Sequence, residues 1–206
     1  NNALDANTTA NNNTAVGHSS LGANTTGTIN TAVGYDTLTV NTTGSYNTAM
    51  SPAALDANTT GSYNTGIGYR ALSANTTASY NTAIGYNSLE LNTTGANNVA
   101  VGRQALQANT TGANCTAIGL NALTANTTAN TNTAVGKDAL AANTTGEKNI
   151  AVGFQAGLTS TTVSANTALG YKALKVNTGA SNTAVGSEAL TLNTTGANNV
   201  ATGIYA

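Results

Sequence analysis

Residues able to do chemistry are few and scattered in this chain. It holds one histidine, His18, and one cysteine, Cys115. A zinc site needs several Cys, His or carboxylate ligands at short spacings, and no such cluster surrounds His18. We therefore interpret His18 as a surface residue and Cys115 as a neutral substitution, not a nucleophile. No catalytic, cofactor-binding or metal-ligating residue is predicted, and we do not expect an enzyme.

The acidic residues are interpreted as solvated surface charges. Catalytic carboxylates must lie at a defined short separation, and no spacing in this sequence indicates such a pair. The acids occur at unrelated places in the chain: Asp5, Asp36, Asp56, Glu90, Asp138, Glu147 and Glu188.

The overall composition excludes two classes of partner. Only 6% of the 206 residues are charged and the net charge is -1. Such a chain cannot neutralise a row of phosphates, so nucleic acid is not expected as a partner. No apolar run approaches the roughly 20 residues that span a bilayer, so no membrane insertion is expected in this segment. A single cysteine also excludes an intrachain disulfide.

The most conspicuous feature of the sequence is a period of 17 residues. We number coil positions from the first Asn of each NTAVG motif, so that the unit reads N-T-A-V-G-Y-x-A-L-x-A-N-T-T-G-x-x. Ser51 fills one gap in the glycine series, and one residue is lost where NTT becomes NTG at Asn177 to Gly179. The glycines at position 5 are Gly17, Gly34, Gly68, Gly85, Gly102, Gly119, Gly136, Gly153, Gly170, Gly186 and Gly203.

This period predicts an all-β fold. Helical repeats need about 33 to 47 residues, whereas apolar residues within this unit alternate with period two, as in strands. We expect a parallel β-solenoid of about twelve coils with two short strands per coil, because stacked coils can pair every backbone amide. Residues 1–206 form one tandem-repeat domain in this prediction, either a segment of a longer array or a filament subunit.

The apolar pattern also predicts which side chains face inward. Position 2 switches between Thr, Val99 and Ile150, so positions 2 and 4 are expected to face the core, as are positions 9 and 11, for example Leu89 and Leu91. The alanines of positions 3 and 8 would then form two outward stripes. Either a narrow solenoid tolerates only small side chains there, or another chain packs closely against them.

Four columns of recurring side chains add to the prediction. The asparagines of positions 1 and 12 are expected to form two hydrogen-bonded ladders. The same Asn-Thr-Thr triplets match the glycosylation sequon, although a buried Asn ladder explains the same letters. Tyrosines at positions 6 and 17 are expected to form outer ladders, which either only stack or offer contacts for a partner or glycan.

One coil departs from the consensus. Gly157 stands in place of Leu, Ser160 in place of Asn, and Val163 in place of Gly. We expect Leu158 to slip inward and to produce a local bulge.

A resemblance to a known family rests on short motifs. Asn97 to Gly102, read NNVAVG, resembles the NSVAIG motif of the YadA-like head of trimeric autotransporter adhesins, and Asn198 to Gly203 echoes it. The whole unit is also similar to repeats of bacterial surface proteins and phage tail-fibre shafts. The resemblance implies a left-handed parallel β-roll, three chains side by side, an adhesive role, and a location on a bacterial surface or virion. It implies no catalytic residues.

The expected function is therefore structural and adhesive, in the shaft of an extracellular fibre. The expected partners are copies of the chain, as a homotrimer, bundle or end-to-end filament, with a surface glycan or host receptor as a further candidate. A phage tail-fibre shaft involved in host attachment is one alternative. An ice-binding solenoid is another, disfavoured here because the position-2 threonines are assigned to the core and the Thr-Thr pairs to turns.

Overall fold

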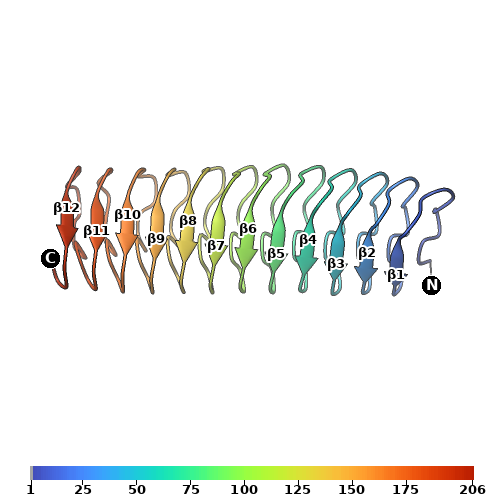
Figure 1. The fold of residues 1–206 in the computed structure, drawn as a ribbon, viewed down its shortest axis with the longest axis horizontal. Coiled ribbons are helices and arrows are strands. Elements are labelled where there is room, and N and C mark those ends of the chain that lie inside the picture. The colour runs from blue at the N-terminus through green and yellow to red at the C-terminus, as the bar shows by residue number, and fades with distance from the viewer. Residues whose placement is uncertain (1) are drawn as a thin grey trace.

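The computed structural model describes residues 2–206 as one straight rod of stacked coils (Figure 1). Each full coil contributes one three-residue strand, at positions 2 to 4 of the repeat. The predicted parallel β-solenoid is thus confirmed. The strands are β1 (Thr14–Val16), β2 (Thr31–Val33), β3 (Thr48–Met50), β4 (Thr65–Ile67), β5 (Thr82–Ile84), β6 (Val99–Val101), β7 (Thr116–Ile118), β8 (Thr133–Val135), β9 (Ile150–Val152), β10 (Thr167–Leu169), β11 (Thr183–Val185) and β12 (Val200–Thr202).

All twelve strands join one parallel sheet in sequence order. The pairing keeps equivalent residues opposite each other, as in Ala83 opposite Ala100. Register survives the missing residue, because Thr167 still pairs with Thr183 and the shortened turn absorbs the loss. The strands keep nearly one direction along the rod (Figure 1). Such untwisted sheets are uncommon and are typically stabilised by stacked identical side chains.

The two faces of the strand are the reverse of those predicted. In β6, Ala100 is fully buried, whereas Val99 and Val101 on either side of it are partly exposed. The alanines of position 8, such as Ala105, are fully buried as well. The inward assignment of positions 2 and 4 is therefore wrong, and so are the outward alanine stripes. Of the two interpretations of alanine, the burial supports a narrow interior that admits only small side chains.

The second strand expected in each coil, around positions 9 to 11, is absent from residues 2–206. The leucines of position 9 are buried as predicted, apart from the partly buried Leu4 and Leu190, but their φ angles lie between 47° and 56°, for example 52° at Leu106. A left-handed residue cannot continue a β-strand, so this part of the coil is a series of turns. Position 11 faces outward instead of inward, since Val40 and Leu91 are exposed.

Both conformation and space favour glycine at position 5. The φ of these glycines lies between 127° and 145°, a region that other residues rarely adopt, and Ser51, which holds the position in one coil, has a φ of 104°. A Cβ atom on Gly85 would lie 2.7 Å from the backbone oxygen of Gly102 in the next coil. Glycine therefore lets successive coils stack closely at the end of each strand.

Both predicted asparagine ladders are present and buried. At position 12, the Asn58 amide nitrogen donates to Oδ1 of Asn41 at 2.8 Å and to the Gly61 carbonyl at 3.0 Å. At position 1, Oδ1 of Asn47 accepts the backbone N–H of Asn64 at 3.0 Å. Because the position-12 amides are buried and use both hydrogens, the triplets are explained by the ladder and not by glycosylation of the folded rod.

The irregular coil keeps its register. Gly157 adopts a φ of 60°, like the leucines it replaces, and its N–H donates to the Ala173 carbonyl at 2.9 Å. Leu158 remains at position 10 and is only partly buried. The predicted inward slip and bulge are therefore wrong. The departure from the consensus instead leaves the buried hydroxyl of Ser160 without a hydrogen-bond partner.

Candidate binding surface

Because positions 2 and 4 of each strand face outward, their side chains form a regular array on the outside of the rod. We call it the strand face and define it as the outward side chains at positions 2 and 4 of β1 to β12. Nine of the twelve strands begin with Thr, and the other three begin with Val99, Ile150 and Val200. At position 4 every strand has Val, Ile, Leu or Met except β12, which has Thr202. The face thus carries one column of hydroxyls beside one column of apolar side chains.

The strand face repeats in two directions. Along the rod, neighbouring strands in a sheet lie about 4.8 Å apart. Across the rod, positions 2 and 4 are two residues apart, which corresponds to about 6.6 Å at the usual rise of a strand. The in-register pairing of every strand keeps these two spacings constant from coil to coil.

The threonine hydroxyls of the strand face are available to an external partner. Within the described chain, no side-chain hydrogen bond engages the position-2 threonines. The threonines of position 13 differ, because their hydroxyls donate to the next coil, as from Thr42 to the Thr59 carbonyl at 3.1 Å. The same donation recurs from Thr93 to the Thr110 carbonyl at 3.0 Å. The strand face therefore presents one column of unbonded hydroxyls beside one column of apolar side chains.

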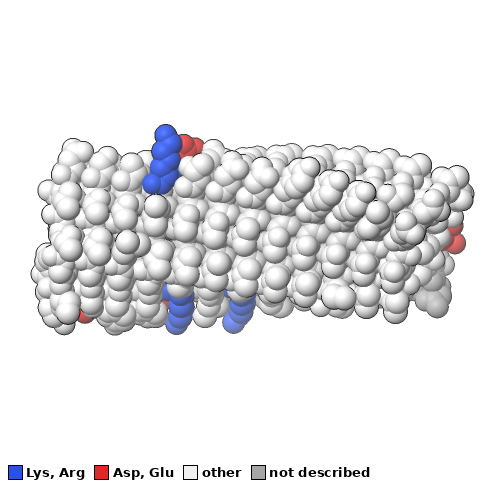
Figure 2. Space-filling model, viewed as in Figure 1, with Lys and Arg blue, Asp and Glu red and all other residues white. Residues whose placement is uncertain are grey.

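Charged side chains avoid the strand face. Lys, Arg, Asp and Glu occur only at coil positions 6, 7, 10, 16 and 17. Figure 2, drawn from the strand side, shows an uncharged central surface with the charged groups confined to its rims. The strand face is consequently a long surface without charged side chains.

His18 lies on the surface, as predicted. It is exposed at position 6, stacks on Tyr35 with ring centroids 5.2 Å apart, and its Nδ1 lies 3.6 Å from Oδ1 of Asp36. Among residues 2–206 no group of three or more His, Cys, Asp or Glu side chains is placed to hold a metal ion.

Cys115 occupies the interior, in the ladder position otherwise held by Asn. Its Sγ lies 3.4 Å from the Ala129 carbonyl oxygen, and burial raises the pKa of the thiol. A raised pKa leaves less thiolate at neutral pH, which argues against a reactive nucleophile. The placement agrees with the interpretation of Cys115 as a substitution within a structural column.

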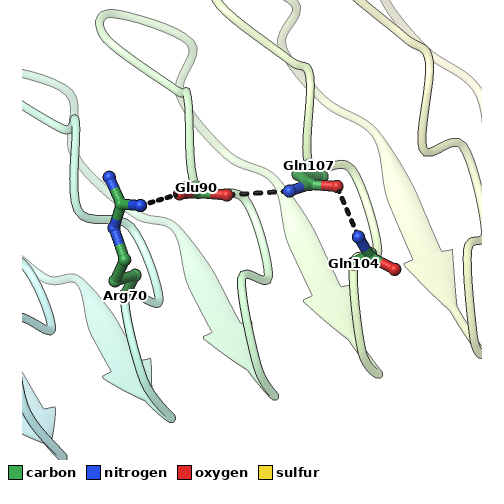
Figure 3. Close-up of polar contacts among 4 residues, drawn as sticks. All are labelled: Arg70, Glu90, Gln104 and Gln107. Atoms are coloured by element: carbon green, nitrogen blue, oxygen red, sulfur yellow. Dashed lines mark hydrogen bonds and ion pairs between the residues drawn. The ribbon is translucent and has the colours of Figure 1, made fainter.

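Two of the acids are not the solvated charges that we predicted. Glu90 is only 5% exposed and forms an ion pair with Arg70 at 2.9 Å. Gln107 in the following coil donates to Glu90 at 2.8 Å and accepts from Gln104 at 3.0 Å, so the network runs across neighbouring coils (Figure 3). Asp56 occupies the same coil position as Glu90, and burial raises its pKa. The shared position 10 was the sequence signal that could have revealed this polar column.

The aromatic ladders stack as predicted. Tyr46, Tyr63 and Tyr80 lie in one column with ring centroids 4.7 and 5.1 Å apart. A second pair, Tyr69 and Tyr86, stacks at 5.6 Å. Stacking covers ring faces inside each column with neighbouring rings and leaves mainly the ring edges exposed. The columns are therefore poor platforms for a sugar that must stack on a ring face.

Fold and surface together define the class to which this chain belongs, a tandem-repeat parallel β-solenoid with an uncharged strand face. No protein-family model, curated protein or solved structure matches the chain. In the part of the chain that the structure describes, no helix is long and apolar enough to cross a membrane.

Proposed function

We propose that the chain is a structural rod, a section of the shaft of an extracellular fibre on a bacterial surface or virion. The observation that supports this proposal is the unbroken coil-to-coil bonding of the sheet from β1 to β12. Asparagine side chains reinforce it in the interior, as between Asn58 and Asn41. A rod held together in this way resists bending and separates its two ends by a fixed distance.

The extracellular setting and the adhesive role are further parts of the proposal. The motif resemblance to YadA-like heads supports both. The single thiol is buried at Cys115, so an oxidising exterior offers it little chemistry. The proposal includes no catalytic step.

Copies of the chain are the partners that we propose for the shaft. The buried alanines no longer support lateral packing, but the column of Tyr46, Tyr63 and Tyr80 does. These side chains are 46%, 48% and 59% exposed, and tyrosine is enriched at protein interfaces. Sedimentation of the purified chain should give a multiple of its mass, and Tyr63→Ser should weaken the association. A stable monomer at micromolar concentration would contradict this part of the proposal.

Small-angle scattering and electron microscopy test the shaft itself. About twelve coils stacked at the usual sheet spacing give a rod on the order of 60 Å long. We expect straight particles of that length or of end-joined multiples. Antibodies raised against the chain should label the exterior of intact cells or virions of its source. Globular particles, or labelling only after permeabilisation, would count against the proposal.

A further inference from the structure

We propose that the strand face binds ice, with the threonine hydroxyls of position 2 and the apolar side chains of position 4 as the contact surface. The ligand would be the ordered water at the surface of an ice crystal. This function goes beyond the structural role, because it assigns a chemical task to one face of the rod.

The geometry of the face is the first reason. Ice is a rigid, periodic ligand, so a protein surface can engage it over a large area only if the surface is flat and periodic as well. The strand face repeats at about 4.8 Å along the rod and about 6.6 Å across it, so it is periodic in both directions. The in-register sheet and its nearly constant strand direction extend this periodicity over many coils (Figure 1).

The chemistry of the side chains is the second reason. A threonine hydroxyl both donates and accepts hydrogen bonds, and those of position 2 have no partner within the described chain. β-branched side chains have restricted χ1 angles, so little entropy is lost when Thr, Val and Ile are fixed against a solid. The methyl groups restrict the orientation of adjacent water. No charge interrupts this surface (Figure 2).

The distribution of threonine is the third reason. The assignment of position 2 to the core was the objection to an ice-binding surface, and the structure reverses that assignment. Strands β1 to β5 present an uninterrupted run of Thr at position 2. The hydroxyls of position 13 are satisfied internally, and the exposed threonines of position 14 form only a single column in a turn. The strand face is thus the surface on which a column of free threonine hydroxyls lies beside a second ordered column, the apolar side chains of position 4.

Thermal hysteresis and ice-crystal shaping of the purified 206-residue chain test the proposal. The decisive variant is Thr48→Tyr, which places a bulky ring in the middle of the β1 to β5 run. The matched control is Thr60→Tyr in the same coil, where an exposed threonine at position 14 is replaced identically on another surface. We expect hysteresis and faceted crystals from the unmodified chain, loss of most of the hysteresis in Thr48→Tyr, and no change in Thr60→Tyr.

Several outcomes would overturn the inference. One is a folded chain without hysteresis or shaping, and another is equal activity in the two variants. A third is an oligomer that Thr48→Tyr dissociates while Thr60→Tyr does not, which would make the strand face an interface between copies. Circular dichroism confirms folding, and Thr31→Tyr replaces Thr48→Tyr if that variant unfolds. Rod-shaped scattering without hysteresis would reject ice binding and leave the proposed shaft intact.

Discussion

Single polar residues in the interior set how firmly neighbouring coils are joined. Within an unbroken run of the ladder, a position-12 asparagine donates to the coil before it and accepts from the coil after it, as Asn41 does between Asn24 and Asn58. One replacement therefore affects two coils. Ser160 shows this, because both its own hydroxyl and Oδ1 of Asn143 are buried without a partner.

Restoring the ladder should stabilise the rod. In Ser160→Asn the new amide can donate to Oδ1 of Asn143, as Asn143 itself donates to Asn126 at 3.1 Å. Satisfying a buried acceptor is worth about 1 to 3 kcal/mol, so the free energy of unfolding in urea should rise by that amount. The control is Ser187→Asn at a partly exposed position 6, for which we expect little change. An unchanged urea midpoint in Ser160→Asn would show that the orphaned atoms cost nothing.

Asp56 should make stability depend on pH in a predictable direction. Burial, the largest cause, raises its folded-state pKa above the unfolded value, and Oδ1 has no hydrogen-bond partner. Its contribution is therefore fully favourable below the unfolded pKa and is lost as pH rises through the folded pKa. We expect Asp56→Asn to unfold at a higher temperature than the unmodified chain at neutral pH, and the two melting temperatures to converge in acid. If the difference between the two melting temperatures grew in acid, the predicted direction of the pH dependence would be wrong.

At the scale of the strand, the sequence determined the period but not the face. Alternation in Thr-Ala-Val is compatible with either orientation, and a shift of one residue exchanges the two faces. The usual preference of large apolar residues for the core then favoured the wrong orientation, with positions 2 and 4 facing inward. The interior instead holds Ala, Leu and Asn, because coils this narrow leave room at position 3 only for a methyl group. The candidate surface was missed for the same reason.

The turn around position 9 was unpredictable from local preferences. Leu106 and its equivalents adopt left-handed φ angles that bulky residues normally avoid. Burial of the leucine side chain and stacking on identical coils offset this local cost. The Asn ladders and Tyr columns, in contrast, were predictable, since each depends only on the repeat bringing identical side chains together.

The reversed faces can be tested within β6. Ala100 is fully buried, so Ala100→Leu should overpack the interior and lower the free energy of unfolding by about 1 to 3 kcal/mol. Val101 points outward, so Val101→Leu should change the free energy of unfolding by no more than about 0.5 kcal/mol. Chemical denaturation of both variants measures the difference. If Val101→Leu lowered the free energy of unfolding more than Ala100→Leu, the inward orientation of Val101 predicted from the sequence would be right.

At the scale of the whole molecule, each coil bonds only to the coil before it and the coil after it. Stability in such arrays is approximately a sum of coil terms and nearest-neighbour terms. The register across the shortened turn between β10 and β11 shows how local the constraints are, because one missing residue leaves the sheet in step. What the rod requires is that positions 1 to 5, 9 and 12 recur in order, and not a particular number of coils.

Removal of one complete unit should therefore leave a folded, shorter rod. Deletion of residues 116–132 joins Cys115 at position 1 to Thr133 at position 2 and brings Asn109 next to Asn143 in the ladder. We expect cooperative unfolding to persist and scattering to show a rod shorter by about 4.8 Å, one strand spacing. Deletion of residues 116–123 is the control, because it removes β7 and half a unit, so the remaining half-coil cannot bridge β6 and β8 and the stack should be interrupted there, with unfolding at a lower denaturant concentration. If both deletions unfold the chain, the coils depend on distant parts of the rod, and the nearest-neighbour account of its stability is wrong.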